Sequence, residues 1–454
     1  MIIYSIIQKS KLEGALRIDA EYYQPEYLEL EKRLNSLKTK TIDEICESVI
    51  SFGAYSLTSN IVWKNDGVPY INVGDIHNGY INFSNVKYIS EKVDGILNKS
   101  RVNNGQVLLT MAGTIGNAAV VHNIPRPANA NQAIAKITPL KGISPYYLAA
   151  FLNSKYGRLQ TQREIVSSVQ ANIFLGTIKK FKIPVFNNAE TKEVEQKYKN
   201  FLNELENLKT FYAQAERILF EELELVDFKA DKSLFSVVNL SEVEDADRID
   251  AEYFQEKYKK LVKKIKLNNA KRLGDLVSIK KGFEPGSEQY YEEGKLFIRV
   301  SSLSVNGINL TDEKYLSEKL YNELKDNYQP KVGEILLTKD ATPGIAYTVK
   351  EPVEGIMSGG ILRLKIKENI NAEYLTLCLN SVIGKMQAER DSGGSVIAHW
   401  KPEQIKNMLI PILPKEIQEK IADLVRQSHE ARKKAKELLE EAKLKVEEMI
   451  ENKK

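Results

Sequence analysis

An internal duplication is the feature that most constrains how this chain folds. The string "RIDAEYYQ" at residues 17–24 returns as "RIDAEYFQ" at residues 248–255, 231 residues later. The pair "TIDEI" (41–45) and "RLGDL" (272–276) keeps the same spacing. Solenoid repeats recur about every 20 to 50 residues, so a period this long predicts two copies of one complete domain.

Further strings follow in the same order in both copies. They pair "YINVGDI" (70–76) with "FIRVSSL" (297–303), "GQVLLTMAGTIGNA" (105–118) with "GEILLTKDATPGIA" (333–346), "YLAAFLNSKYGRLQTQR" (147–163) with "YLTLCLNSVIGKMQAER" (374–390), and "IKKFKIPVF" (178–186) with "IKNMLIPIL" (405–413). With 454 residues, of which 43% are hydrophobic, the chain is long enough to form two separate cores.

Within each copy, short β-branched runs alternate with Gly, Asn and Pro turn signals. The first copy contains "VPYINV", "GYINF", "QVLLTMA", "NAAVV" and "AIAKIT", which predict strands of a mixed or antiparallel sheet. A helix is expected around "SPYYLAAFLNSKYG" (144–157), and a short second one before Pro184. Each copy is therefore predicted to be an α+β domain.

The period of the apolar residues changes after each copy to intervals that alternate between three and four. This spacing is typical of a coiled-coil seam. The seam residues are Tyr198, Phe201, Leu205, Leu208, Tyr212, Ala215 and Leu219 in the first segment, and Ile417, Ile421, Leu424, Ser428, Ala431, Ala435, Leu438 and Ala442 in the second. Lys445 is expected to break the second seam. We predict that the two helices pair with each other; the alternative is two separate amphipathic helices, each packed on its own domain.

Composition and motifs remove several classes of function. Cys46 and Cys378 stand alone and the four histidines lack metal-ligand spacing, so neither disulfides nor a metal site are predicted. No GxxxxGK[ST] phosphate loop and no loop for holding a flipped base are found, so we predict no catalytic residue and no cofactor. The absence of a long apolar run or an export signal predicts a cytoplasmic protein without membrane contact.

The loops, where the two copies differ most, carry mixed basic, amide and aromatic side chains. A net charge of +4 permits nucleic-acid binding without requiring it. One framework with two unlike loop sets predicts one scaffold that reads two targets, because such side chains bond base edges and phosphates. The candidate DNA-binding residues are Lys64, Asn65, His77, Asn78, Tyr80, Arg126, Asn131, Gln132, Lys280, Lys281, Lys339, His399, Trp400 and Lys401. The alternative is a set of ordinary solvated loops.

Taken in order, the doubled strings resemble the specificity subunit of a type I restriction-modification system. The resemblance covers nearly the whole chain and includes the "RIDAEYY/F" opening, the "GQVLLT"/"GEILLT" strand, the "YLAAFLNS"/"YLTLCLNS" helix and the passage into a long helix. One departure is "NNAETKEVEQ" (187–196), which stands where the second copy has "LPKEIQEKI" (413–421).

The resemblance implies a particular architecture. It is an α+β fold of two tandem globular α/β target-recognition domains, separated by two long helices that form an antiparallel coiled coil, with an internal pseudo-twofold repeat. The expected bounds are 1–187 and 229–413 for the two recognition domains, and 188–228 and 414–454 for the central and C-terminal helices.

The resemblance also implies a function without catalysis by this chain. Each domain would read one half of a bipartite, asymmetric site in double-stranded DNA. The helices would set the spacing and dock two DNA methyltransferase (modification) subunits, which restriction/translocase subunits join in the full complex. Adenine methylation and ATP-dependent cleavage would belong to those subunits. The alternatives are a stand-alone sequence-specific DNA-binding regulator, a single-chain enzyme with a divergent active site, and the specificity chain of a type II-like methyltransferase or nuclease.

The repeated opening is expected to begin each copy at a turn that leads into a helix, with Asp19 and Asp250 as N-caps. We interpret it as the place where each domain docks on the coiled coil. The alternative is contact with a modification subunit.

Overall fold

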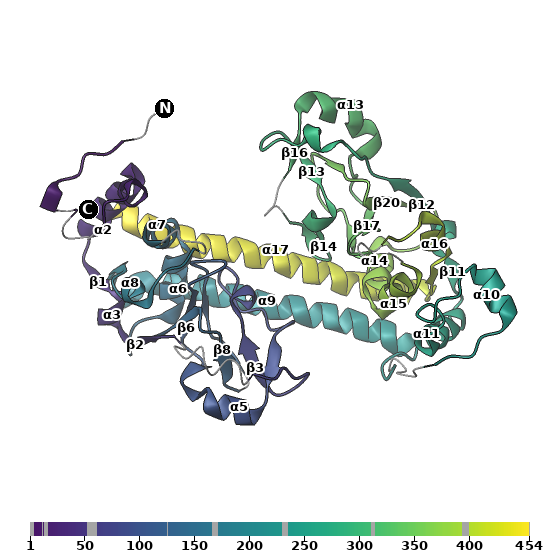
Figure 1. Ribbon diagram of the computed structural model, residues 1–454, viewed down its shortest axis with the longest axis horizontal. Coiled ribbons are helices and arrows are strands. Elements are labelled where there is room, and N and C mark those ends of the chain that lie inside the picture. Colours follow the sequence, from purple (N-terminus) through teal and green to yellow (C-terminus); the bar gives the residue numbers. More distant parts are fainter. Residues whose placement is uncertain are drawn as a thin grey trace. The chain divides into compact units, whose positions relative to one another are not determined.

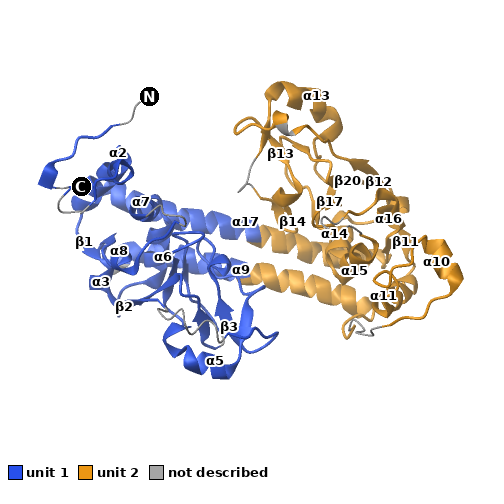
Figure 2. Cartoon of the chain, viewed as in Figure 1, with its two compact units in different colours: residues 1–205, 432–454 blue, residues 206–431 orange. Residues whose placement is uncertain are grey.

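The structure, a computed structural model, repeats one series of helices and strands (Figure 1). It describes residues 4–10, 12, 17–51, 61–124, 126–165, 171–228, 235–309, 314–392 and 399–453. Part of the predicted loop string "SGGSVIAHWKP", residues 393–398, lies outside the described residues. The chain divides into two compact units, which comprise residues 1–205 with 432–454 and residues 206–431 (Figure 2).

Unit 1 contains the first copy. Its helices are η1 (Ala20–Tyr23), α2 (Pro25–Asn35), α3 (Ile42–Ile45), η2 (Val73–Asp75), α5 (Glu91–Ile96), η3 (Asn98–Ser100), α6 (Pro145–Asn153), α7 (Lys155–Glu164) and α8 (Leu175–Ile178). Its strands are β1 (Thr39–Thr41), β2 (Cys46–Ile50), β3 (Val68–Ile71), β4 (Lys87–Ile89), β5 (Arg101–Val102), β6 (Val107–Thr110), β7 (Ala118–Val120), β8 (Ala128–Ala130), β9 (Ile134–Pro139) and β10 (Lys182–Pro184).

Unit 2 contains the second copy. Its helices are α10 (Leu240–Ala246), α11 (Glu256–Lys266), α12 (Leu273–Leu276), η4 (Ser287–Gln289), η5 (Val300–Ser302), α13 (Glu318–Tyr328), α14 (Ala372–Asn380), α15 (Val382–Asp391) and α16 (Pro402–Asn407). Its strands are β11 (Lys271–Arg272), β12 (Val277–Lys281), β13 (Lys295–Ile298), β14 (Leu303–Ser304), β15 (Gly307–Ile308), β16 (Tyr315–Leu316), β17 (Ile335–Thr338), β18 (Ala346–Thr348), β19 (Gly355–Met357), β20 (Ile361–Ile366) and β21 (Leu409–Ile410).

The sheets of the two units have matching strand orders, which confirms the predicted α+β duplication. An antiparallel sheet runs β2-β9-β6-β7 in unit 1 and β12-β20-β17-β18 in unit 2. A second sheet, β4-β3-β8-β5 or β16-β13-β19, contains one parallel pair in each unit. The small pairs β1-β10 and β11-β21 also correspond. The predicted strand "GYINF" is wrong: it supplies only two isolated bridges, of Ile81 with Ile76 and of Gly79 with Ala119, because Gly79 turns the chain at a φ of 92°.

The predicted helix at 144–157 is two helices, α6 and α7, that meet at a corner. Ser154 has extended backbone angles (φ −70°, ψ 168°) and ends α6. The corner is sharp enough that a Cβ on Gly157 would overlap the backbone of Phe151 and Leu152. A side-chain amide just before the corner, on Asn153, bonds both backbone groups of Ala118 in β7, at 3.1 and 2.7 Å. This link ties α6 to the sheet.

Two long helices, α9 (Asn188–Glu222) and α17 (Lys415–Asn452), pair with each other. In unit 1, Glu193 forms an ion pair with Lys445 at 2.9 Å, and Lys197 forms one with Glu441 at 2.5 Å. The residue numbers rise along α9 as they fall along α17, so the two helices are antiparallel. In unit 2, Ser428 Oγ donates to the carbonyl of Leu208 at 3.0 Å. These contacts confirm mutual pairing.

The buried stripe of α17 departs from the predicted seam. Its buried residues are Gln418, Ile421, Ala422, Val425, Ser428, Ala431, Ala435, Leu439, Ala442, Val446 and Ile450. Leu424 and Leu438, predicted in the seam, are only partly buried, and the stripe continues past Lys445. The spacing drifts toward 3.6 because each helix packs on its partner helix and also on a globular domain, which broadens the buried face.

The other predicted seam residues belong to the hydrophobic cores of the two units or pack against them. Tyr198 and Phe201 belong to the core of unit 1, as Leu219 and Ile421 belong to that of unit 2. The partly buried members packed against these cores are Leu205 and Leu438 in unit 1 and Tyr212, Ile417 and Leu424 in unit 2. Leu208 has intermediate exposure.

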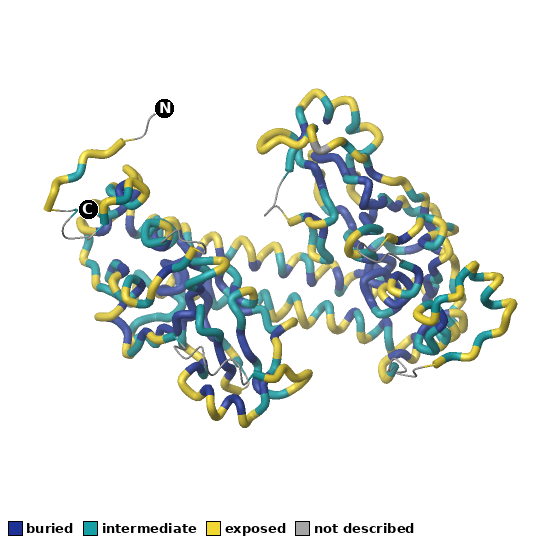
Figure 3. Tube along the Cα trace, viewed as in Figure 1, coloured by how far each residue is buried: buried dark blue, intermediate teal, exposed yellow. Residues whose placement is uncertain are grey.

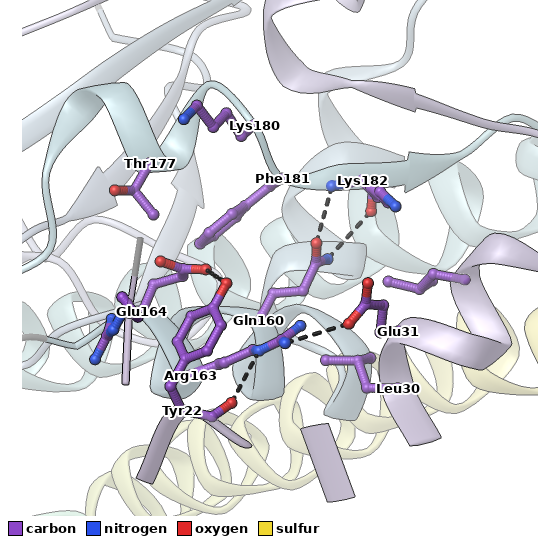
Figure 4. Close-up of a pocket in the computed structure, with 12 residues that line it drawn as sticks. Tyr22, Leu30, Glu31, Gln160, Arg163, Glu164, Thr177, Lys180, Phe181 and Lys182 are labelled. Atoms are coloured by element: carbon purple, nitrogen blue, oxygen red, sulfur yellow. Dashed lines mark hydrogen bonds and ion pairs between the residues drawn. The ribbon is translucent and has the colours of Figure 1, made fainter. Parts of the chain in front are cut away.

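The repeated opening contacts α7, and its docking on the long helices stays a prediction. Tyr22 lies between two guanidinium groups, with Arg17 at 4.5 Å and Arg163 at 4.2 Å from the ring centroid. Its hydroxyl donates to Glu164 at 3.1 Å, beside a hollow of about 460 Å³ (Figure 4). Burial, together with the nearby Glu164, raises the pKa of Tyr22 to about 12.

The same clamp recurs in unit 2. Tyr253 lies between Arg248 and Arg390, at 4.8 and 5.1 Å from the ring centroid. The predicted N-cap role is corrected: Asp19 precedes η1 but makes no cap hydrogen bond, and Asp250 precedes a turn. Each carboxylate instead accepts two hydrogen bonds from the arginine two residues earlier.

Candidate nucleic-acid interface

The turn at residues 77–80, predicted to contact DNA, packs against the long helices within unit 1. Tyr198 donates its hydroxyl to the carbonyl of Gly79 at 2.7 Å, and the ring of Tyr80 meets Phe201 edge-on at 6.2 Å. His77 stacks on Tyr80 at 5.0 Å, and burial lowers the pKa of its imidazole. Asn78 has a buried side-chain oxygen. The turn therefore joins the domain to the helices within unit 1, and a contact of its half-buried side chains with DNA stays a prediction.

Trp400 was also predicted to contact DNA, and the structure corrects this. Its side chain is 1% exposed within the core of unit 2. Its backbone N–H donates to the carbonyl of Lys339 at 2.9 Å, which turns the indole inward. A base cannot reach a ring buried in this way.

Three other predicted residues of unit 2 lie close together at the end of β17. His399 Nδ1 is 2.8 Å from Asp340 Oδ1, and Lys339 forms an ion pair with the same carboxylate. Gly359 and Gly360 lie close to these groups. A Cβ added to Gly360 would be 3.5 Å from Asp340, and one added to Gly359 would overlap the carboxylate of Glu284. Glu284 forms an ion pair with Lys281. Lys281, Lys339 and His399 therefore surround one glycine turn.

Asp340 holds this group together. Burial works to raise its pKa, but hydrogen bonds from Lys339 and His399 outweigh burial and keep the pKa below its ordinary value. The carboxylate is therefore ionised at neutral pH and fixes the two neighbouring donors. The sequence analysis missed Asp340, although it adjoins Lys339 in the quoted loop "TKDATPG".

The equivalent place in unit 1 is defined by the same backbone hydrogen bonds. Asn131 N–H donates to the carbonyl of Ile71 at 2.9 Å, as Ser358 N–H donates to Ile298. An isolated bridge joins Ala112 to Asn172, as another joins Asp340 to His399. We call this place the strand-end site. It comprises Met111, Ala112, Asn131, Gln132 and Asn172 in unit 1, and Lys339, Asp340, Ser358, Gly359 and His399 in unit 2.

The chemistry of the strand-end site differs between the units. Unit 1 contains three amides, and the buried side-chain oxygen of Gln132 has no hydrogen-bond partner among the described residues. Unit 2 presents Lys339, Asp340 and His399, with His399 exposed. Side-chain amides suit adenine edges, whereas basic groups suit guanine and phosphate. The residue missed in unit 1 is Asn172, which only the fold brings beside Asn131.

The remaining predicted residues of unit 1 lie along the β3–β4 edge. Lys64 and Asn65 are exposed, and the backbone of Lys64 bonds Tyr88 of β4. Lys87 lies 4.8 Å over the ring of the half-exposed Trp63, an arrangement that the sequence analysis missed. Arg126 bonds the carbonyl of Gly67 and forms a 3.5 Å ion pair with Glu91. Figure 3 colours the Cα trace of both units by how far each residue is buried.

The last two predicted residues of unit 2 stand apart from the strand-end cluster. Lys280 donates to Asn327 at 2.9 Å and lies 5.4 Å from the ring of Tyr328. Lys401 is exposed, and its backbone N–H donates to Gln404. Within the described part of the chain, no group of three or more metal-ligating side chains occurs, and no helix is long and apolar enough to cross a membrane.

The duplicated fold and the paired helices agree with the family that the sequence matches. The model of the type I restriction modification DNA specificity domain matches residues 36–217 and again residues 266–442. The chain therefore belongs to the type I restriction-modification DNA specificity family.

Individual relatives are more distant. The specificity subunit of the type I restriction enzyme MjaIX from Methanocaldococcus jannaschii is 25% identical over 433 residues, which covers 90% of each chain. That of EcoBI from Escherichia coli is 32% identical over 90 residues, or 20% of this chain and 19% of the relative. A type I S subunit structure from M. genitalium aligns over 91% of this chain and 96% of that one, with 14% identity and a TM-score of 0.44.

Proposed function

We propose that this chain is a non-catalytic specificity subunit whose two domains each read one half of a bipartite, asymmetric DNA site. The long helices would set the gap between the half-sites and dock two modification subunits, with restriction/translocase subunits joining the full complex. The modification subunits would methylate adenine, and ATP-dependent cleavage would belong to the restriction subunits.

The observation that carries the proposal is the contrast between framework and strand-end site. The two units share strand order, the Asn153/Asn380 links to the sheet and the opening clamp. They differ in the side chains of the strand-end site, which are amides in unit 1 and include charged groups in unit 2. A pair of readers for two unlike half-sites needs this combination, because sequence is read by base-edge contacts and position by the scaffold.

The test is methyl transfer from labelled S-adenosylmethionine to DNA, measured with the purified chain, with a modification subunit, and with both together. We expect specific adenine methylation only with both, and weak DNA binding by the chain alone, since its net charge is modest. Methyl transfer by the chain alone would contradict the proposal. Tight sequence-specific binding that the modification subunit leaves unchanged would favour a stand-alone regulator.

A further inference from the structure

One histidine of the strand-end site in unit 2 is exposed and held in place by three neighbours. The side chain of His399 is 63% exposed, whereas that of Asp340 is 21% exposed and that of Lys339 is 12% exposed. His399 Nδ1 lies 2.8 Å from Asp340 Oδ1, and Lys339 Nζ donates to the other oxygen of the same carboxylate. The next residue, Trp400, is buried and bonds the carbonyl of Lys339 through its backbone N–H. Both the backbone and Nδ1 of His399 are therefore fixed.

Asp340 decides which ring nitrogen of His399 carries the proton. Asp340 is ionised, and a carboxylate can only accept hydrogen bonds. Nδ1 of His399 must therefore donate, which leaves the lone pair of Nε2 as an acceptor when the imidazole is neutral. Nε2 makes no hydrogen bond to the described residues and belongs to the exposed side of the ring. The group that this site offers to a ligand is thus an acceptor, although histidine is a basic residue.

An acceptor selects a donor on the DNA. In the major groove, the donors on base edges are the exocyclic amino groups N4 of cytosine and N6 of adenine, whereas guanine, thymine and the phosphates present acceptors. We propose that His399 reads an amino group of cytosine or adenine in the half-site of unit 2, and that Asp340 and Lys339 are positioning residues that set the direction of this hydrogen bond. This inference rests on the proposed function and names the base group that one of its sites takes.

The equivalent place in unit 1 has other residues. Ala112 and Asn172 are joined by an isolated bridge as Asp340 and His399 are, and Met111 takes the place of Lys339. The strand-end site of unit 1 therefore contains no carboxylate that orients a histidine. The proposed contact belongs to one half-site only, as two unlike half-sites require.

The variant Asp340→Asn tests the inference because it should reverse the hydrogen bond of Nε2. Lys339 can only donate, so it should take the oxygen of the new amide and leave the amide N–H for Nδ1 of His399. Nε2 would then carry the proton and donate. The preferred base should change from cytosine to thymine or from adenine to guanine, because an exocyclic oxygen replaces the amino group at the same place in the groove. A purely structural role of Asp340 would weaken binding without exchanging one base for another.

Binding is measured with the assembled complex of the full chain and the modification subunit, on duplexes with single-base changes, in a buffer alkaline enough to keep imidazole neutral. His399→Phe keeps an aromatic ring without nitrogen and locates the base that is read, where preference should fall by roughly tenfold. At that position, a cytosine or adenine analogue without its amino group should weaken the wild type as much and leave His399→Phe unaffected. Glu354→Gln is the control, because Glu354 accepts a hydrogen bond from Lys295 at 2.6 Å, and it should bind as the wild type.

The outcomes separate this inference from the proposed function. Wild-type base preference in His399→Phe, or a loss of affinity that is equal for all sequences, would overturn the inference and leave the proposed function standing. If Asp340→Asn unfolds at a lower temperature than the wild type, the analogues decide: wild-type binding that is unchanged by removal of every amino group in that half-site would overturn the inference. A wild-type complex that recognises no asymmetric, two-part site would overturn both.

Discussion

Lys339 and His399 are the two basic residues of the strand-end site in unit 2, where unit 1 has Met111 and Asn172. Exchanging them for the unit 1 residues, as Lys339→Met with His399→Asn, should relax base preference in one half-site. Each lost base contact should cost about 1–3 kcal/mol of discrimination. The measurement is the affinity of the assembled complex for DNA duplexes that carry single-base changes.

Lys325→Met is the matched control for this exchange, because Lys325 pairs with Asn322 on the surface helix α13. It should leave base preference unchanged. A loss of affinity in the exchanged variant that is equal for all sequences would show that Lys339 and His399 contact phosphates only.

Gly79 makes a second residue-scale prediction. Its φ is 92°, and an added Cβ would lie 2.9 Å from a methyl of Leu439 and 3.0 Å from the ring of Phe201. Gly79→Ala should therefore destabilise unit 1 by about 1–3 kcal/mol, because the crowding falls on the packed helix interface. Gly74→Ala has no atom within 4 Å of the new Cβ and should leave the thermal unfolding curve unchanged. Equal midpoints for both variants would show that the turn does not support the helix contact.

The loop composition predicted a polar, DNA-facing role for residues whose final positions depend on the fold. Lys281, Lys339 and His399 do converge, but the strings that contain them are up to 118 residues apart, so their proximity required β12, β17 and the segment before α16. Trp400 and Tyr80 show the limit of the method. An aromatic residue within a polar stretch of sequence can either contact a base or pack into a hydrophobic core. Backbone hydrogen bonds of the neighbouring residues determine which of the two occurs.

At the scale of elements, the paired helices predict a dependence of half-site spacing on helix length. Seven residues inserted between Leu205 and Glu206 in α9 and between Ala431 and Arg432 in α17 fall at the boundaries of the units. A heptad preserves the facing side chains and adds about 10 Å at about 1.5 Å per residue. Since DNA rises about 3.4 Å per base pair, the gap should grow by roughly three base pairs.

The control for this insertion is four residues in α9 alone, which rotates one face away from its partner and should weaken assembly. Mapping methylated sites reports the gap directly. An unchanged gap in an active heptad variant would mean that helix length does not set the spacing.

Helix and strand elements were largely predictable because the duplication supplied each pattern twice. The presence of the strands, the two long helices and the pairing of those helices follow from that pattern, whereas the strand orders came from the fold. The details that differ arise from tertiary packing: the corner at Ser154, and the broad buried stripe that includes Val425 and Leu439 in place of Leu424 and Leu438. A periodicity reports one buried face, whereas α17 buries a second face against globular domains.

At the scale of the whole molecule, the duplication predicts that one half can replace the other. A fragment ending near residue 230 leaves Tyr198 and Phe201 without Leu439 and Val446, which share their core. The equivalents of those two residues in α9, at the 227-residue spacing, are Tyr212 and Leu219. The fragment should therefore dimerise through α9, which ultracentrifugation measures, and should direct methylation to an inverted repeat of the first half-site. A stable monomer would contradict paired helices as the basis of assembly.

The central claim is that the two units read two different half-sites independently. The most direct measurement is a genome-wide map of methylated adenines in cells that produce the modification subunit with either the wild-type chain or the variant Lys339→Met, Asp340→Ala, His399→Asn. We predict a single asymmetric, two-part motif with a fixed gap for the wild type, and a changed base preference in one part only for the variant. A continuous or palindromic wild-type motif, or a change in both parts of the variant's motif, would contradict the claim.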